Sequence, residues 1–449
     1  MSIKTGKKVF AGILFITFFW LILKFCLPHG QLKYAAPTLL PHTEWRMKCS
    51  GFWIGLHPYP DRVILNSAQV SALNLRTETE PGLINNILNI GPFYQGGKLR
   101  ENLRRELGGF LKGRFYNAKG WKTGNQFYRR IEENTRIENI PSTINVRYGF
   151  ILGYVDQRVL PARDIITAVP FDFDFDELQN SSLDAGTPLA ILHETIDKEW
   201  FYAVTPASSG WVQKKFVAVC SYSQMADYLK KDFCVVTAAK TGIFWDSVLT
   251  QYYEYARMGA KFAINSQGVD SIGIIVPFYD EKRGFYERTA YLKKEDVSIG
   301  FLPYTPRTVI EQAFKMLNAP YGWGGVNGEQ DCSSFLQEIF ATVGILLPRN
   351  SADQAKAGIK TAEFKEHSDN EKKLLFLARE CAGGVNLLKL KGHIVLYLGQ
   401  FNGRFYVIHE TSGYRERVWW HDRVRVLRRV VVSDLSLGQG SAKGALLGF

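Results

Sequence analysis

The sequence predicts an α+β protein of several domains. At 449 residues the chain is too long for one ordinary core, because domains average ~150 residues. Its hydrophobic content of 46% and charged content of 22% are those of a globular protein. The residue pattern changes along the chain from helix-like, to short β-rich runs, to helices followed by strands. Each change marks an expected domain boundary.

The first 28 residues differ from the rest. Three lysines precede the apolar run "VFAGILFITFFWLIL", and Lys24 follows it. This pattern is typical of an export signal or a membrane anchor, although the run is shorter than the ~20 residues of a membrane-spanning helix. A cleaved signal, a retained anchor formed by residues 9–28, and lipidation at Cys26 all remain open. In each case the body is expected on the far side of a membrane.

The net charge and the cysteine content limit the kinds of binding partner and metal site that are expected. A net charge of +12 favours acidic surroundings, such as anionic lipid or a carboxylate-rich polymer, and nucleic acid does not fit behind an export segment. The six cysteines form neither a CxxC pair nor a Cys/His cluster, so no metal site is expected. Cys220 and Cys234 could form a disulfide or stay as free thiols. The basic run at 414–429 alternates with apolar residues and predicts one half-buried strand.

Four folded regions are expected after the export segment. Residues 44–143 are mainly helical and carry no chemical motif. Short β-rich runs at 144–221 and 222–303, such as "TPLAILHET" and "CVVTAAKTGIFWD", predict two small β-barrels that bind or position substrate. The last domain, 304–445, begins with a helix for which Thr308 is a candidate cap.

The chemistry-bearing residues lie in this last domain. In "DCSSF", Cys332 opens a helix, where free N–H groups and the helix dipole favour a thiolate. Asp331 fits the cap position or faces the substrate, and the sequence does not separate the two. His393 opens an apolar strand and is the candidate general base, while His409 on the next strand would orient it.

Strand register tests this arrangement. If residues 401–403 form a three-residue loop, His409 faces Val395 and lies on the same sheet face as His393. A two-residue turn would shift the register by one and place His409 on the opposite face. The catalytic interpretation therefore requires the longer loop or a bulge.

The sequence resembles the NlpC/P60 cysteine peptidases of bacterial cell walls. The matching pieces are "PYGWGG", "DCSSF", "LPRNSADQ", "GHIVLYLG" and "VIHET", in that order between residues 307 and 427. The resemblance implies a papain-like catalytic domain preceded by two bacterial SH3-like β-barrels and a helical N-terminal segment. It assigns Cys332 as nucleophile, His393 as base and His409 as orienting residue, with no cofactor.

The resemblance also implies a substrate. The reaction is hydrolysis of the γ-D-glutamyl–diamino acid amide in peptidoglycan stem peptides, in the periplasm or cell envelope. Expected substrate-binding residues are Tyr321, Asp331, Ser333, Asn350 and Asp176, with Asp176 a candidate partner for the free amine of an N-terminal L-alanine. Some relatives carry aspartate where Asn350 stands, and the segment 357–390 is longer than in the shortest members.

Two other functions remain as alternatives: a non-catalytic wall-binding protein, and an acyltransferase that passes the thioester to an amine or alcohol. The first is disfavoured by the intact Cys332, His393 and His409 set, and product mass would separate the second from hydrolysis. The sequence leaves open the diamino acid, the choice between intact wall and released fragments, and the oligomeric state.

Overall fold

The computed structural model describes residues 33–34, 39–80, 83–364, 369–419 and 421–441. The predicted export or anchor segment 1–28, with Lys24 and Cys26, lies outside these residues. Within them, no helix is both long and apolar enough to cross a membrane.

The N-terminal helices divide between two cores. Trp53 and Val70, from the first two α-helices, are buried with the core of the C-terminal domain, whereas Leu103 and Ile131 are buried with the first β module. The elements are η1 Trp45–Lys48, α2 Ser50–Leu56, α3 Ser67–Thr79, η2 Ile87–Asn89, β2 Phe93–Gln95, α4 Gly96–Lys112, β3 Tyr116–Asn117, α5 Asn125–Thr135, η3 Ile137–Asn139 and β4 Thr143–Asn145.

The first β module is a sheet of seven strands in the order β12-β5-β9-β10-β11-β6-β8. Phe201 and Val212 are fully buried inside it. The elements are β5 Arg147–Ile151, β6 Val155–Arg158, β7 Ile166–Thr167, β8 Gln179–Leu183, β9 Pro188–Glu194, β10 Trp200–Val204, β11 Ser209–Gln213, η4 Lys214–Phe216 and β12 Val217–Cys220, followed by α6 Tyr222–Leu229.

The second β module is a separate sheet of seven strands in the order β15-β14-β18-β17-β16-β13-β19. The two β-rich stretches of the sequence therefore form two sheets, and Cys220 and Cys234, one in each, are free thiols. The elements are β13 Phe233–Val236, β14 Lys240–Phe244, β15 Tyr252–Arg257, β16 Lys261–Gln267, β17 Ser271–Asp280, β18 Gly284–Lys293, η5 Lys294–Asp296 and β19 Val297–Ile299.

The C-terminal domain is a sheet in the order β1-β23-β22-β21-β20 with helices on both faces. Leu396 and Ile408 face α2, α7 and α8, and Val395 and Val407 face α10. The elements are β1 Lys33–Tyr34, α7 Pro306–Lys315, η6 Trp323–Gly328, α8 Cys332–Ala341, α9 Ser351–Ala357, α10 Asn370–Glu380, β20 Leu387–Leu390, β21 His393–Phe401, β22 Arg404–Val418 and β23 His421–Asp434.

Two local predictions in this domain were wrong. Helix α7 is capped by Thr305, whose side chain accepts the N–H of Thr308 at 3.1 Å, because Pro306 supplies a favourable first helical residue one turn earlier. The basic run 414–429 is a hairpin rather than one strand, since Val418 pairs with His421. Alternation alone does not show where a long strand reverses.

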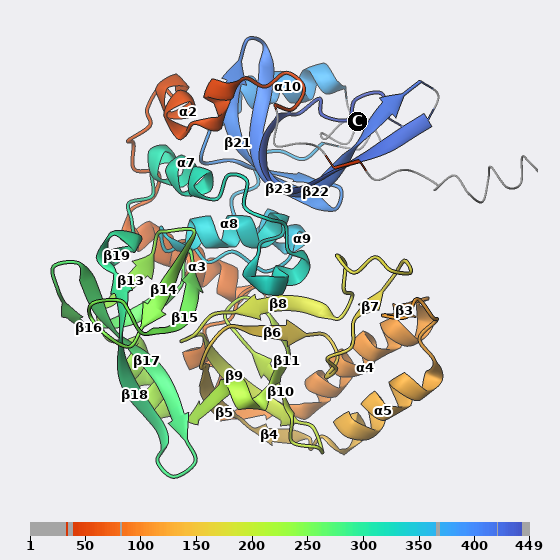
Figure 1. The fold of residues 1–449 in the computed structure, drawn as a ribbon, viewed down its shortest axis with the longest axis vertical. Helices are drawn as coiled ribbons and strands as arrows, with labels where there is room; N and C mark the ends of the chain where they lie inside the picture. The colour runs from red at the N-terminus through yellow and green to blue at the C-terminus, as the bar shows by residue number, and fades with distance from the viewer. Residues whose placement is uncertain (1–32, 35–38, 81–82, 365–368, 420, 442–449) are drawn as a thin grey trace, which may run out of the picture.

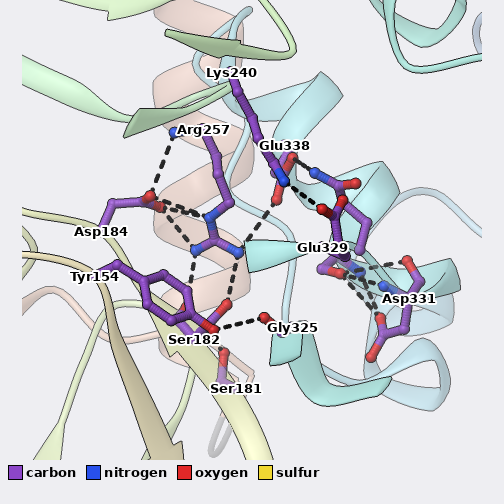
Figure 2. A network of polar contacts seen from close by, with 12 residues as sticks. Tyr154, Ser181, Ser182, Asp184, Lys240, Arg257, Gly325, Glu329, Asp331 and Glu338 are labelled. Carbon is purple, nitrogen blue, oxygen red and sulfur yellow. Dashed lines mark hydrogen bonds and ion pairs between the residues drawn. The ribbon is translucent and has the colours of Figure 1, made fainter. Parts of the chain in front are cut away.

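Helices α8 and α9 lie between the C-terminal sheet and the β modules (Figure 1). One buried cation joins these parts. Arg257, at the end of β15, donates to the Asp184 carboxylate at 2.8 Å and to the Ser182 hydroxyl at 2.6 Å in the first β module. Its Nη1 also lies 3.5 Å from the Glu338 carboxylate in α8, as Figure 2 shows. The helix that carries Cys332 is thus held by both β modules.

Candidate active site

The cysteine is positioned by a helix cap. The Asp331 carboxylate accepts the N–H groups of Ser333 and Ser334 at 3.1 and 2.9 Å. The Ser334 hydroxyl in turn accepts the N–H of Asp331 at 2.8 Å, which completes a capping box. Cys332 is therefore the first residue of α8. Of the two roles considered for Asp331, the structure shows the cap.

A buried arginine holds this cap in place. Arg349 binds both Asp331 oxygens, at 2.6 and 3.1 Å, and donates to the Ser333 hydroxyl at 2.8 Å. Its Nε also donates to the Ser181 hydroxyl of β8 at 3.2 Å. Both Asp331 oxygens and the Ser333 hydroxyl are thus bound within the protein. The Arg349 side chain thus connects the first β module to the residues on either side of the nucleophile.

The two histidines meet as predicted. His393 Nε2 lies 2.8 Å from His409 Nδ1, and His409 Nε2 lies 3.0 Å from the Ser433 hydroxyl on β23. Both His409 and Ser433 are buried. Because Nε2 of His393 is occupied by His409, the nitrogen that remains to accept a proton from the thiol is Nδ1.

A β-bulge makes this meeting possible. Phe401 pairs with Arg404, so Asn402 and Gly403, both with positive φ, form a two-residue turn. The register then shifts between Tyr397 and Gly399, and Leu396 pairs with Ile408. That pairing, continued by one residue, sets His409 opposite Val395 and on the face of His393. Of the two conditions stated for the catalytic interpretation, the structure meets the second.

The strands part where the site begins. The ladder of β21 and β22 ends at the Leu396–Ile408 pair, and the backbone of Ile394 lies near enough to the Cys332 sulfur to favour its thiolate. Cys332 also packs against the core that contains Ile394. The nucleophile therefore sits against the opened start of β21, next to His393.

The other predicted site residues lie in different surroundings, and not all of them are near Cys332. Tyr321 is half-buried close to Asp331 and Cys332, and its burial, followed by the Asp331 charge, raises its pKa above the ordinary value. Asn350 is exposed at the start of α9 and makes no cap hydrogen bond. Asp176 is turned inward: Arg158 binds it at 2.6 Å, and the N–H groups of Ile166 and Leu178 donate to it.

The structure therefore does not bring Asp176 to the site. A cleft beside His393 is lined instead by Asp172, Asp174 and Phe175 from the preceding loop of the first β module. Its other walls come from Thr411 to Arg415 on β22 and from residues 385–394. The long segment after α9 also borders this cleft, at 358–364 and through α10.

Comparison with known proteins identifies two domains in the chain. Residues 318–419 match the NlpC/P60 family, and residues 170–213 match the SH3 domain of SH3b1 type. The chain contains an NlpC/P60 domain and an SH3b domain. A solved structure of an NlpC/P60 endopeptidase from Photobacterium damselae subsp. piscicida superposes on 91% of this chain and 93% of its own, with a TM-score of 0.72 at 18% identity. The predicted α+β fold class is confirmed.

Two curated relatives are similar over part of the chain. A gamma-D-glutamyl-L-lysine dipeptidyl-peptidase of Bacillus subtilis (strain 168) is 28% identical over 33% of this chain and 52% of the relative. The protein of the same name from Bacillus cereus (strain ATCC 10987 / NRS 248) is 33% identical over 43% of this chain and 54% of the relative. The chain thus spans about half the length of each.

The electrostatics of the NlpC/P60 site favour neutral partners at rest. Burial and the Asp331 charge raise the pKa of the Cys332 thiol to about 11. Their effect on this pKa is larger than the opposite effect that the sequence led us to expect from the helix dipole. Burial and Lys389 lower the pKa of His393 to about 4. The pKa of Asp331 falls to about 2 despite its burial, because Arg349 and the cap donors bind it. At neutral pH both the Cys332 thiol and the His393 imidazole are therefore uncharged.

Two residues of the NlpC/P60 site were not found from the sequence. Arg349 lies inside the matching piece "LPRNSADQ", but nothing local indicates that it reaches back to Asp331. Ser433 follows an apolar run on β23, and only the pairing of His409 with Val431 brings it near. The structure also explains why glycine is needed at Gly325 in "YGWGG". This residue has φ of 86°, and a Cβ there would lie 2.2 Å from the Ser182 hydroxyl.

Proposed function

We propose that this chain is a cysteine endopeptidase that hydrolyses the γ-D-glutamyl–diamino acid amide of peptidoglycan stem peptides. The observation that carries the proposal is the chain of hydrogen-bonded side chains His393, His409 and Ser433, on the sheet against which Cys332 packs at the start of α8. The names of the curated relatives support the substrate class.

The proposed reaction assigns one role to each of these side chains. His393 Nδ1 takes the Cys332 proton as the sulfur attacks the γ-carbonyl carbon. The cap uses the N–H groups of Ser333 and Ser334 and leaves that of Cys332 for the oxyanion. The C–N bond then breaks, the leaving amine receives the proton from His393, and water hydrolyses the thioester. His409 acts as a neutral orienting residue that accepts Nε2–H of His393 and donates to Ser433.

The cleft also suggests how a free N-terminal L-alanine is bound. Its ammonium needs an acidic partner, and Asp172 lines the cleft whereas Asp176 does not. Burial and Asp174 raise the pKa of Asp172, and a bound ammonium would reverse that shift. Asp172→Asn is expected to raise KM for L-Ala-γ-D-Glu-diaminopimelate and to leave the N-acetylated peptide unaffected.

The deciding experiment is mass spectrometry of L-Ala-γ-D-Glu-diaminopimelate incubated with residues 39–449, wild type beside Cys332→Ala. Release of L-Ala-D-Glu by the wild type alone is expected. No cleavage, or equal cleavage by both proteins, would contradict the proposal. A product mass that corresponds to transfer onto an added amine, without free acid, would indicate an acyltransferase.

A further inference from the structure

Lys389, on β20, lies on the same side of the sheet as the nucleophile. In the pairing of β20 with β21, Lys389 stands opposite Ile394, and paired residues share a sheet face. Ile394 belongs to the core against which Cys332 packs, and so does Leu387, two residues before Lys389. The lysine therefore projects toward the start of α8.

The ammonium of Lys389 is available to an anion. It donates to the carbonyls of Leu390 and His393, and no ion pair with a carboxylate involves it among the described residues. The side chain is exposed and lines the cleft beside His393. Its charge is felt at the reacting groups: it favours the thiolate of Cys332 and disfavours the protonated form of His393.

The cleft is acidic on its SH3b side and mostly basic on its other sides, where Lys360, Lys373 and Arg415 also line it. The SH3b side contributes Asp172 and Asp174, and Asp174 is paired with Arg428 of β23. The β20–β21 side contributes Lys389 and Lys391. A cationic wall next to the nucleophile suits a substrate whose carboxylates flank the scissile amide, and both the D-glutamate and the diamino acid of a stem peptide carry one.

We propose that Lys389 is a substrate-binding residue that receives a carboxylate adjacent to the scissile γ-amide. This inference rests on the proposed function, and it deepens it by assigning the specificity for anionic substrate. Two groups offer that chemistry: the α-carboxylate of D-glutamate and the α-carboxylate of the diamino acid. A lysine is suited to either, as a compact point charge.

The first test does not depend on peptide cleavage. Alkylation of Cys332 by iodoacetate and by neutral iodoacetamide is followed by peptide mass spectrometry in the wild type, Lys389→Met and Lys389→Arg. The iodoacetate-to-iodoacetamide rate ratio is expected to fall about five-fold in Lys389→Met and to be restored in Lys389→Arg. Lys372→Met, on the exposed side of α10, removes the same charge and should leave the ratio unchanged. An equal ratio in wild type and Lys389→Met would overturn the proposal, even in an active peptidase.

The second test identifies the carboxylate. KM is compared for substrates with D-glutamate or its α-amide, D-isoglutamine, and with diaminopimelate whose α-carboxylate is free or amidated. A roughly ten-fold rise in KM for Lys389→Met that disappears with D-isoglutamine assigns the glutamate carboxylate, and one that disappears with the amidated diaminopimelate assigns the diamino acid. A similar rise on every substrate would overturn the inference. If the wild type cleaves none of them, the proposed function fails and the alkylation ratio still decides the anion site.

Discussion

At Cys332 two neighbouring residues oppose each other electrostatically. The Asp331 charge makes the thiolate less favourable, and Lys389 makes it more favourable. Asp331 is nevertheless needed to begin α8 at the cysteine, so the same carboxylate improves geometry and lowers intrinsic reactivity. Pairing with Arg349 reduces this conflict because it neutralises much of the charge.

The first prediction follows from this conflict. Asp331→Asn is expected to lower the pKa of the Cys332 thiol from about 11 toward its ordinary value. It should cost about 3–5 kcal/mol of stability, because Arg349 stays buried without its charged partner even though asparagine can still cap the helix. The pH dependence of iodoacetamide alkylation and urea unfolding measure the two effects. Ser334→Ala breaks the same capping box without removing a charge and should leave the thiol pKa unchanged. Slower alkylation of Asp331→Asn near pH 8 would contradict the argument.

The second prediction concerns pH and stability. The pKa of His393 is about 4 in the folded protein and 6.5 when unperturbed, so between these values the unfolded chain binds more protons. The stability associated with neutral His393 is therefore fully present above pH 6.5 and is lost as pH falls toward 4. The unfolding free energy of the wild type should drop by roughly 2 kcal/mol more than that of His393→Gln between pH 7 and 4.5. Equal drops would refute it.

Among the elements, the β21–β22 hairpin determines whether the two histidines meet. Gly399 in the bulge has φ of 137°, a conformation that other residues rarely adopt. Gly399→Val is expected to destabilise the domain by roughly 1–3 kcal/mol and to lower kcat. Deletion of Gly399 would leave Leu398 opposite Tyr406 and keep Tyr397 opposite Val407, so activity should survive. Calorimetry and the peptide assay measure stability and kcat for both variants. A deletion variant that folds but is inactive would show that the bulge itself is required.

The same hairpin shows which features of the site could be predicted from the sequence. The turn residues Asn402 and Gly403 and the alternation of apolar residues predict two paired strands, and the chemistry of the histidines required one of two registers. The bulge itself has no signal beyond Gly399, because it depends on packing against both sheet faces. Arg349, Ser433 and the inward turn of Asp176 toward Arg158 were not predictable for a similar reason: their partners are distant in the chain.

At the scale of the whole molecule, a group of buried charged and polar side chains joins the C-terminal domain to the two β modules. Arg257 contacts Asp184, Ser182 and Glu338 (Figure 2), and burial raises the pKa of Glu338 to about 8. Removal of one member of such a group leaves the others buried without a partner, which typically costs 3–5 kcal/mol.

A prediction at this scale is that Arg257→Met lowers stability by that amount, about 3–5 kcal/mol, and lowers kcat because α8 loses its connection to both β modules. Arg288→Met, in the same module and stacked on Trp245, is the matched control and should affect stability alone. Calorimetry and kcat of the purified variants measure both. An Arg257→Met protein with wild-type kcat would show that the junction does not position the nucleophile.

The division of the N-terminal helices between two cores has a consequence for biosynthesis. His42 contacts Asp434 across 392 residues of sequence, and Tyr406 reaches the carbonyl of His42 across 364. Contacts this distant form slowly, because a very long loop must close first. The NlpC/P60 core needs both α2 and β23, and β23 is synthesised much later than α2. The core therefore cannot be completed until β23 has been synthesised.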